Sequence, residues 1–186
     1  MAKSFVPTLS LLCFSLCILN FPTNSLGLSS IQQACNNTAD YNDLISYEFC
    51  VSAFQSVPES GVADTAGLLS VATQLARDHT TAAIYATKEL KGAASDEKLK
   101  AKLLVCETQF AKAVLSLSIF NMERQEQEYE FAEDLEGIIQ GSWKCERALQ
   151  ESGNKDRELL ANEQNTVQQL VSIVQALAHF VATSKQ

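Results

Sequence analysis

The sequence is short of glycine and proline, the residues that most often interrupt regular structure. It has 7 glycines and 3 prolines among 186 residues, and Pro58 is the only proline after residue 22. No stretch alternates apolar and polar residues between turn-forming residues, which is the pattern of β-hairpins. Apolar residues instead recur every three or four positions over long segments, which is typical of amphipathic helices. These features predict an all-α protein.

Sequence motifs for catalysis and metal binding are missing as well. The chain has 2 histidines, His79 and His179, and neither belongs to a His-x-x-x-His or Glu-x-x-His pair, the spacings that hold zinc or a di-iron centre on helices. There is no Cys-x-x-Cys, no Gly-x-Ser-x-Gly and no glycine-rich phosphate loop. We interpret both histidines as solvated. The sequence predicts no metal, no cofactor and no enzymatic activity, so the protein should act by binding.

The charge balance is acidic, with 22 Asp and Glu against 14 Lys and Arg. Nucleic acids and anionic membrane surfaces are therefore poor partners. Paired carboxylates could hydrolyse glycosides, but the densest acidic set surrounds an expected turn and the outer face of one helix, where no cleft is predicted. We interpret it as a solvated face that could dock a basic enzyme. The set is Glu123, Glu126, Glu128, Glu130, Glu133, Asp134 and Glu136.

The N-terminus has the pattern of a secretory signal peptide. Lys3 is the only charge in the first 39 residues, residues 9–21 are mostly apolar, and residues 25–27 (SLG) place small residues at a cleavage site. The apolar run is shorter than the roughly 20 residues that span a bilayer. The sequence predicts a signal peptide over residues 1–27, a secreted domain over residues 28–186, and no membrane segment in the mature chain.

Four long amphipathic helices are predicted, at about 62–91, 96–121, 127–149 and 156–182. The links between them are short, so successive helices should be antiparallel. We expect an up-down-up-down four-helix bundle over residues 61–186, preceded by a helical hairpin over residues 28–60. The expected core stripe of the first long helix is Leu68, Val71, Leu75, Ala82, Ala86 and Leu90, and that of the second is Leu99, Leu103, Cys106, Phe110, Ala113, Leu117 and Phe120.

Signal cleavage leaves Cys35, Cys50, Cys106 and Cys145, an even set that predicts two disulfides with three connectivities. Residues that face each other in an antiparallel pair are equally distant from the turn. Cys106 and Cys145 are centred on the turn between the second and third long helices, and Cys35 and Cys50 are centred on residues 42–43 (ND). The connectivity Cys35–Cys50 and Cys106–Cys145 satisfies both turns, so a disulfide should close the hairpin.

Short segments around these cysteines resemble the plant pectin methylesterase/invertase inhibitor family. Residues 35–38 read CNNT, residues 47–51 read YEFCV, residues 106–110 read CETQF and residues 145–146 read CE. The second of these is most similar to a branch of invertase-inhibitor-like proteins that includes pollen allergens. The resemblance implies a hairpin, a bundle and an extracellular inhibitor of a cell-wall enzyme. Asn36 begins an N-glycosylation sequon.

The resemblance also points to a target-contact segment, Tyr129, Glu130 and Phe131. In invertase inhibitors of the family a Pro-Lys-Phe stands there, and its Lys is thought to reach the acidic catalytic site. Here the Lys is replaced by Glu130, which the catalytic carboxylates would repel. We therefore expect inhibition of pectin methylesterase through a one-to-one complex, with invertase as the alternative target. From another functional class, a non-inhibitory helical ligand-binding or signalling protein is the competing hypothesis.

Overall fold

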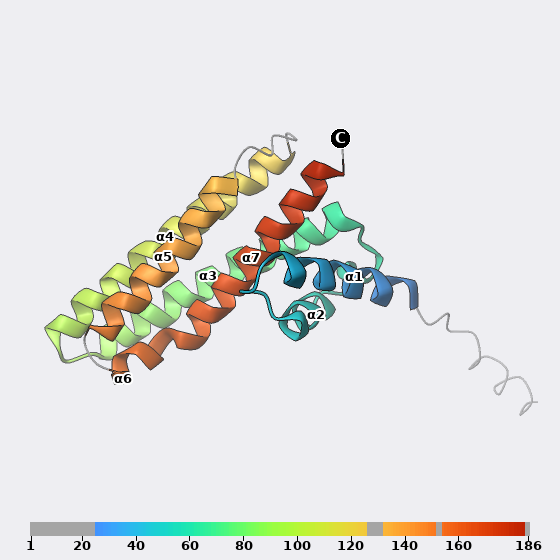
Figure 1. The fold of residues 1–186 in the computed structure, drawn as a ribbon. Helices are drawn as coiled ribbons and strands as arrows, with labels where there is room; N and C mark the ends of the chain where they lie inside the picture. The colour runs from blue at the N-terminus through green and yellow to red at the C-terminus, as the bar shows by residue number, and fades with distance from the viewer. Residues whose placement is uncertain (1–24, 126–131, 152–153, 185–186) are drawn as a thin grey trace, which may run out of the picture.

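The computed structural model describes residues 25–125, 132–151 and 154–184, and within them it consists of helices and short links, with no strand. Two N-terminal helices precede four long helices, and short helical turns lie in two of the links (Figure 1). In chain order the elements are α1 (Ser25–Tyr41), α2 (Tyr47–Gln55), η1 (Pro58–Val62), α3 (Thr65–Ala93), α4 (Glu97–Gln125), α5 (Ala132–Gln150), α6 (Asn154–Arg157), η2 (Glu158–Leu160) and α7 (Ala161–Thr183).

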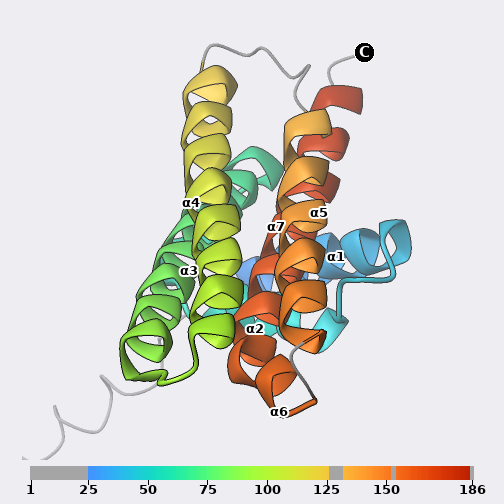
Figure 2. The same ribbon diagram turned by 90° about the vertical axis from the view of Figure 1, so that its left-hand side faces the viewer.

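The four long helices form the predicted bundle. Each of α3, α4, α5 and α7 packs against two of the others, and successive long helices run antiparallel (Figures 1 and 2). The predicted start of the first helix was a few residues early, because Pro58–Val62 forms a 3-10 turn. The helix then begins after Asp64, whose carboxylate accepts a hydrogen bond of 2.8 Å from the Gly67 N–H. The predicted fourth helix is divided, with α6 and η2 before α7.

The predicted core stripe of α4 is buried except for Leu99, which is half-buried, whereas in the stripe predicted for α3 only Leu68 is buried. Ala82 is exposed, whereas Thr73, Thr80 and Thr87 are buried at seven-residue spacing. Each of these threonine hydroxyls donates to the carbonyl four residues earlier, at 2.6–2.8 Å. A buried hydroxyl that is satisfied by its own helix avoids the cost of burying an unpaired polar group. Threonines can therefore line the core face of α3, which we had assigned to a neighbouring stripe of apolar residues.

Helix α4 departs from the sequence analysis in another way. Its segment Glu97–Asn121 is long and apolar enough by composition to cross a membrane, whereas we expected no such segment after the signal peptide. Its inward stripe nevertheless packs in the bundle between α3 and α5. Leu103, Cys106, Phe110 and Leu117 are at most 1% exposed. The helix therefore serves as a core helix that is also rich in apolar residues on its outward side.

The N-terminal pair lies against α7 and the start of α3 (Figure 1). Ile31, Ile45 and Phe54 are buried and belong to the same hydrophobic core as the bundle. Ser46 caps α2 by accepting a hydrogen bond from the Phe49 N–H at 3.3 Å. The backbone N–H of Ser46 donates to Gln169 Oε1 of α7 at 2.9 Å. The pair is thus tied to the bundle by apolar packing and by a specific polar contact.

Two disulfides join the elements. Cys35–Cys50 links α1 to α2, and Cys106–Cys145 links α4 to α5. All four cysteines are fully buried. The pairing is the one derived from equal distances to the turns, and it follows from the antiparallel packing of each helix pair.

Candidate functional site

The target-contact segment expected from the sequence, Tyr129, Glu130 and Phe131, lies outside the described residues. The helices on either side are described: α4 stops at Gln125 and α5 starts at Ala132, at the end of the bundle where α7 also finishes (Figure 2). Most of the acidic set around this segment also has side chains outside the description. Glu136 is described, is exposed, and accepts a hydrogen bond of 2.9 Å from Gln140 Nε2.

The sequon in α1 has its two polar residues in different environments. Asn36 is exposed, whereas Thr38 is fully buried. The Thr38 hydroxyl donates to the Cys35 carbonyl at 3.1 Å and lies 3.7 Å from Cys50 Sγ. A glycan on Asn36 would extend into solvent. The glycosylating enzyme would need to read Thr38 before the hairpin folds, and glycosylation of Asn36 stays a prediction.

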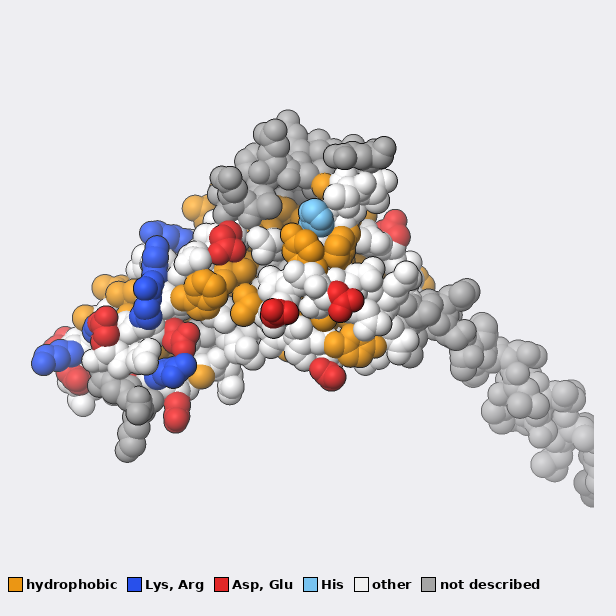
Figure 3. All heavy atoms as spheres, viewed as in Figure 1, with side chains coloured by type: hydrophobic (Ala, Val, Ile, Leu, Met, Phe, Trp, Pro, Cys, Tyr) orange, Lys and Arg blue, Asp and Glu red, His pale blue; other side chains and the backbone are white. Residues whose placement is uncertain are grey.

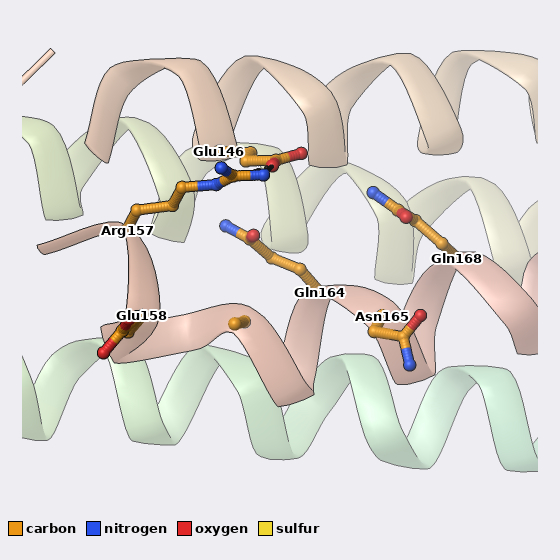
Figure 4. Close-up of a pocket in the computed structure, with 7 residues that line it drawn as sticks. Glu146, Arg157, Glu158, Gln164, Asn165 and Gln168 are labelled. Atoms are coloured by element: carbon orange, nitrogen blue, oxygen red, sulfur yellow. Dashed lines mark hydrogen bonds and ion pairs between the residues drawn. The ribbon is translucent and has the colours of Figure 1, made fainter. Parts of the chain in front are cut away.

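A polar cleft of about 570 Å³ lies between α5, α6 and α7 (Figure 4). Gln164 and Gln168 extend from α7 toward α5, where Gln168 Nε2 donates to Ser142 Oγ at 3.1 Å. At one end, Arg157 is paired with Glu146 at 2.7 Å. The lining offers amides and one ion pair, and it lacks a nucleophile beside a base. Among the described residues, moreover, no three His, Cys, Asp or Glu side chains gather to hold a metal. This chemistry suits binding.

Ion pairs join neighbouring helices on the side of the bundle formed by α3, α4 and α5. Lys91 pairs with Glu107, and Lys88 Nζ lies 3.9 Å from the same carboxylate. Lys102 pairs with Glu151 at 2.5 Å, and this hydrogen bond and charge lower the pKa of the Glu151 carboxyl. These groups are at least partly exposed to solvent, so each pair contributes little to stability.

An aromatic cluster marks the junction between α1 and α7. The Tyr41 ring stacks on the His179 ring at 5.1 Å and meets the Phe180 ring edge-on at 5.6 Å. In Figure 3 a histidine lies among hydrophobic side chains near the C-terminal end of α7. His179 is exposed, in agreement with its interpretation as a solvated side chain, but the sequence did not indicate its ring contacts.

Another surface feature was missed by the sequence analysis. Leu104 and Leu115 of α4 are 53% and 62% exposed, and Tyr85 of the neighbouring α3 is 66% exposed. These residues do not belong to the core stripes. The signal was available, because Leu104, Thr108, Ala111 and Leu115 repeat the spacing of four and three on the outward side of the same helix.

Comparison with known proteins agrees with the resemblance seen in the sequence. The family model described as plant invertase/pectin methylesterase inhibitor matches residues 29–177, from α1 into α7. A relative from Arabidopsis thaliana, named cell wall/vacuolar inhibitor of fructosidase 2, is 30% identical over 129 residues. The aligned region covers 66% of this chain and 69% of the relative. The family match therefore includes the N-terminal pair and most of the bundle.

Proposed function

The chain belongs to the plant invertase/pectin methylesterase inhibitor family, whose members are non-enzymatic inhibitors, and we propose that it blocks a carbohydrate-active enzyme by forming a one-to-one complex. The observation that carries this proposal is the family match, which extends from α1 into α7. The disulfide-linked helical bundle of the described residues supports it further.

A fructosidase, that is an invertase, is the first candidate target. The support is the name of the relative from Arabidopsis thaliana, at 30% identity. The similarity of residues 47–51 to the invertase-inhibitor-like branch points the same way. This order reverses the preference derived from the sequence alone, which depended on a single residue, Glu130.

Pectin methylesterase is the second candidate, and Glu130 favours it. A carboxylate in place of lysine would face repulsion in an acidic catalytic site, and it would suit an enzyme with a basic surface. The discriminating feature is thus one charge in a segment that joins α4 to α5.

The test is a parallel titration of a plant invertase and a plant pectin methylesterase with the disulfide-bonded chain at mildly acidic pH. We expect stoichiometric loss of invertase activity. Glu130→Lys should tighten invertase inhibition by about tenfold or more, since a favourable contact of about 1.4 kcal/mol changes affinity tenfold. Glu89→Lys, the same charge change at an exposed position of α3 outside the acidic set, is the matched control and should have no effect.

The outcomes separate the two targets. Inhibition of pectin methylesterase alone would assign the chain to that enzyme and would agree with Glu130 as the selective feature. If an excess of the chain left both enzymes fully active, the proposed inhibition of either enzyme would be wrong.

The place of action is proposed to be the cell wall or apoplast, after removal of residues 1–27. The relative's name includes cell wall and vacuolar inhibitor, which supports a location on the secretory route. N-terminal sequencing of the chain secreted from plant cells should start near Leu28. Retention inside the cell with an intact Met1 would contradict this proposal.

A further inference from the structure

The outward side of α4 has a second apolar stripe that no described element covers. Figure 2 shows α4 standing between α3 and α5. The exposed, charged Glu97 and Lys112 also lie on this side, but six residues at spacings of three and four are small or apolar, and most of them are exposed. We call them the α4 outer stripe: Ala101, Leu104, Thr108, Ala111, Leu115 and Ser118.

This stripe is a larger feature than scattered surface residues. Eight large hydrophobic side chains are exposed in the described part of the chain, and Tyr85, Leu104, Val105 and Leu115 are four of them. Tyr85 lies near the N-terminal half of the stripe, because Lys88 lies over its ring and also lines a groove with Leu104. Exposed apolar clusters of this kind mark interaction sites.

The stripe has the spacing of a coiled-coil seam. Its members are separated by 3, 4, 3, 4 and 3 positions, as are the a and d positions of a heptad repeat. At 1.5 Å per residue the stripe is about 25 Å long. A partner that fits it is therefore another helix that lies along α4 and brings a similar seam.

Over residues 101–118 the stripe is symmetric about its midpoint, which favours a second copy of this chain as that partner. From either end the order is small, leucine, small, small, leucine, small. A two-fold axis between positions 109 and 110 would place Leu104 opposite Leu115 of a second copy. It would also place Thr108 opposite Ala111, two small residues that let the helix axes approach closely. Such self-complementarity is what an isologous interface requires.

The charges beside the seam are compatible with this arrangement. Glu107, on the flank toward α3, is already paired with Lys88 and Lys91 of its own chain. Lys112 lies on the flank toward α5 and would meet the apolar Val105 of the second copy. In this register the two copies of Lys112 would lie about 7.5 Å apart along the helix axes on this flank, where both are exposed to solvent.

We propose that two copies of this chain associate through antiparallel contact of their α4 outer stripes, with Leu104 of each copy against Leu115 of the other. Tyr85 of each copy would cover the edge of the seam near the second copy's Leu115. A seam of six residues from each copy is well below the roughly 20–30 residues per side of a standard interface. We therefore expect a reversible dimer with a dissociation constant of about 1–100 µM.

Sedimentation velocity of the disulfide-bonded chain from about 1 to 500 µM tests the association, a range that brackets the expected constant. The mass should rise from monomer to dimer. Leu104→Gln combined with Leu115→Gln should weaken association by at least about tenfold, because two apolar side chains lose their burial. Val62→Gln is the control: Val62 is 84% exposed and lies in η1, outside the stripe, so its replacement should leave the dimer unchanged.

Disulfide trapping tests the two-fold register. A mixture of Leu104→Cys and Leu115→Cys chains should form a cross-linked dimer in a glutathione buffer. Leu104→Cys alone should not, because two copies of position 104 would lie about 16 Å apart, beyond the reach of a disulfide. Cross-linking of Leu104→Cys alone would overturn the antiparallel arrangement.

A chain that stays monomeric at all concentrations would refute the proposal. The proposal would also be wrong if the Leu104→Gln, Leu115→Gln variant lost inhibition of the target enzyme at concentrations where the parent chain is monomeric. The outer stripe would then be part of the inhibitory surface. Neither result depends on which enzyme is inhibited.

Discussion

Helices α4 and α7 are both apolar, but they occupy different places in the fold. Residues 170–174 of α7 are all buried, and five consecutive buried residues cover the whole circumference of a helix. Helix α7 is enclosed because α3 and α5 lie on one side and the N-terminal pair lies on the other. Among the described elements, α3 and α5 are the large neighbours of α4, and most of its outer stripe is exposed.

The difference shows how the N-terminal pair shapes the surface. Without α1 and α2, a second long helix would expose apolar residues as α4 does. The pair covers α7 and is fastened there by the Ser46–Gln169 hydrogen bond and the Tyr41 ring contacts. Helix α4 is instead fastened covalently, through Cys106–Cys145. The enclosed helix is held by packing on all sides, whereas the open helix is held by one-sided packing and a disulfide.

Removal of the disulfide that holds α4 should cause the largest loss of stability among these tests. Replacing Cys106 and Cys145 by serine frees a bridge with a sequence separation of 39, for which the loop-entropy model gives about 4 kcal/mol. Urea unfolding should show this loss, and hydrogen exchange should rise more in α4 than in α7. Equal acceleration in both helices would contradict the assignment of the disulfide to α4's stability.

A matched pair of leucine truncations compares the two helices directly. Leu177→Ala in α7 removes a side chain with 0% exposure and should lower the free energy of unfolding by about 2–5 kcal/mol. Leu115→Ala removes an exposed side chain and should change it by less than about 0.5 kcal/mol for the monomer. The comparison fails if the two variants unfold at similar urea concentrations, measured at low micromolar protein.

The contact between the N-terminal pair and α7 should contribute less. Gln169→Ala leaves the Ser46 N–H without its acceptor, at a cost of about 1 kcal/mol. Gln140→Ala is a suitable control, because Gln140 is exposed and bonds within its own helix. Limited proteolysis should cleave the N-terminal pair faster in Gln169→Ala, while the bundle stays intact. If Gln140→Ala had the same effect, the hydrogen bond would not be responsible.

The smallest effect should come from the Lys102–Glu151 pair between α4 and the end of α5. The lysine lowers the pKa of Glu151 in the folded chain, so the pair stabilises the fold above the ordinary carboxyl pKa. This contribution is lost as the pH falls through the folded pKa. Glu151→Gln should therefore be slightly less stable than the parent at pH 7 and equal to it at acidic pH. A difference that grew toward low pH would contradict this sign.

The sequence predicted the helices and the cysteine pairing better than it predicted which helix faces are buried. The bundle and the cysteine pairing followed from periodicity and turn positions, because both depend on local spacing. The core face of α3 did not follow from periodicity, because it includes the polar residues Thr73, Thr80 and Thr87. These can be buried because their hydroxyls donate to carbonyls of their own helix. The outer stripe of α4 was missed for a related reason: one helix carries two apolar stripes, and which of them is buried depends on its neighbours.

The candidate target contact is a different case. Tyr129, Glu130 and Phe131 were identified only by resemblance, and they lie outside the described residues. Their role depends on the surface of another protein, which this sequence does not contain. Spacing within the chain therefore cannot indicate it.

The most direct test of the proposed inhibition is the mass of the complex. The disulfide-bonded chain should be mixed with a plant invertase and, separately, with a plant pectin methylesterase, and each mixture should be passed through a sizing column with light scattering. We predict a species whose mass equals one enzyme plus one inhibitor, formed with the enzyme whose activity is lost. Elution of both enzymes at their own masses, with the chain running separately, would contradict the proposed one-to-one complex.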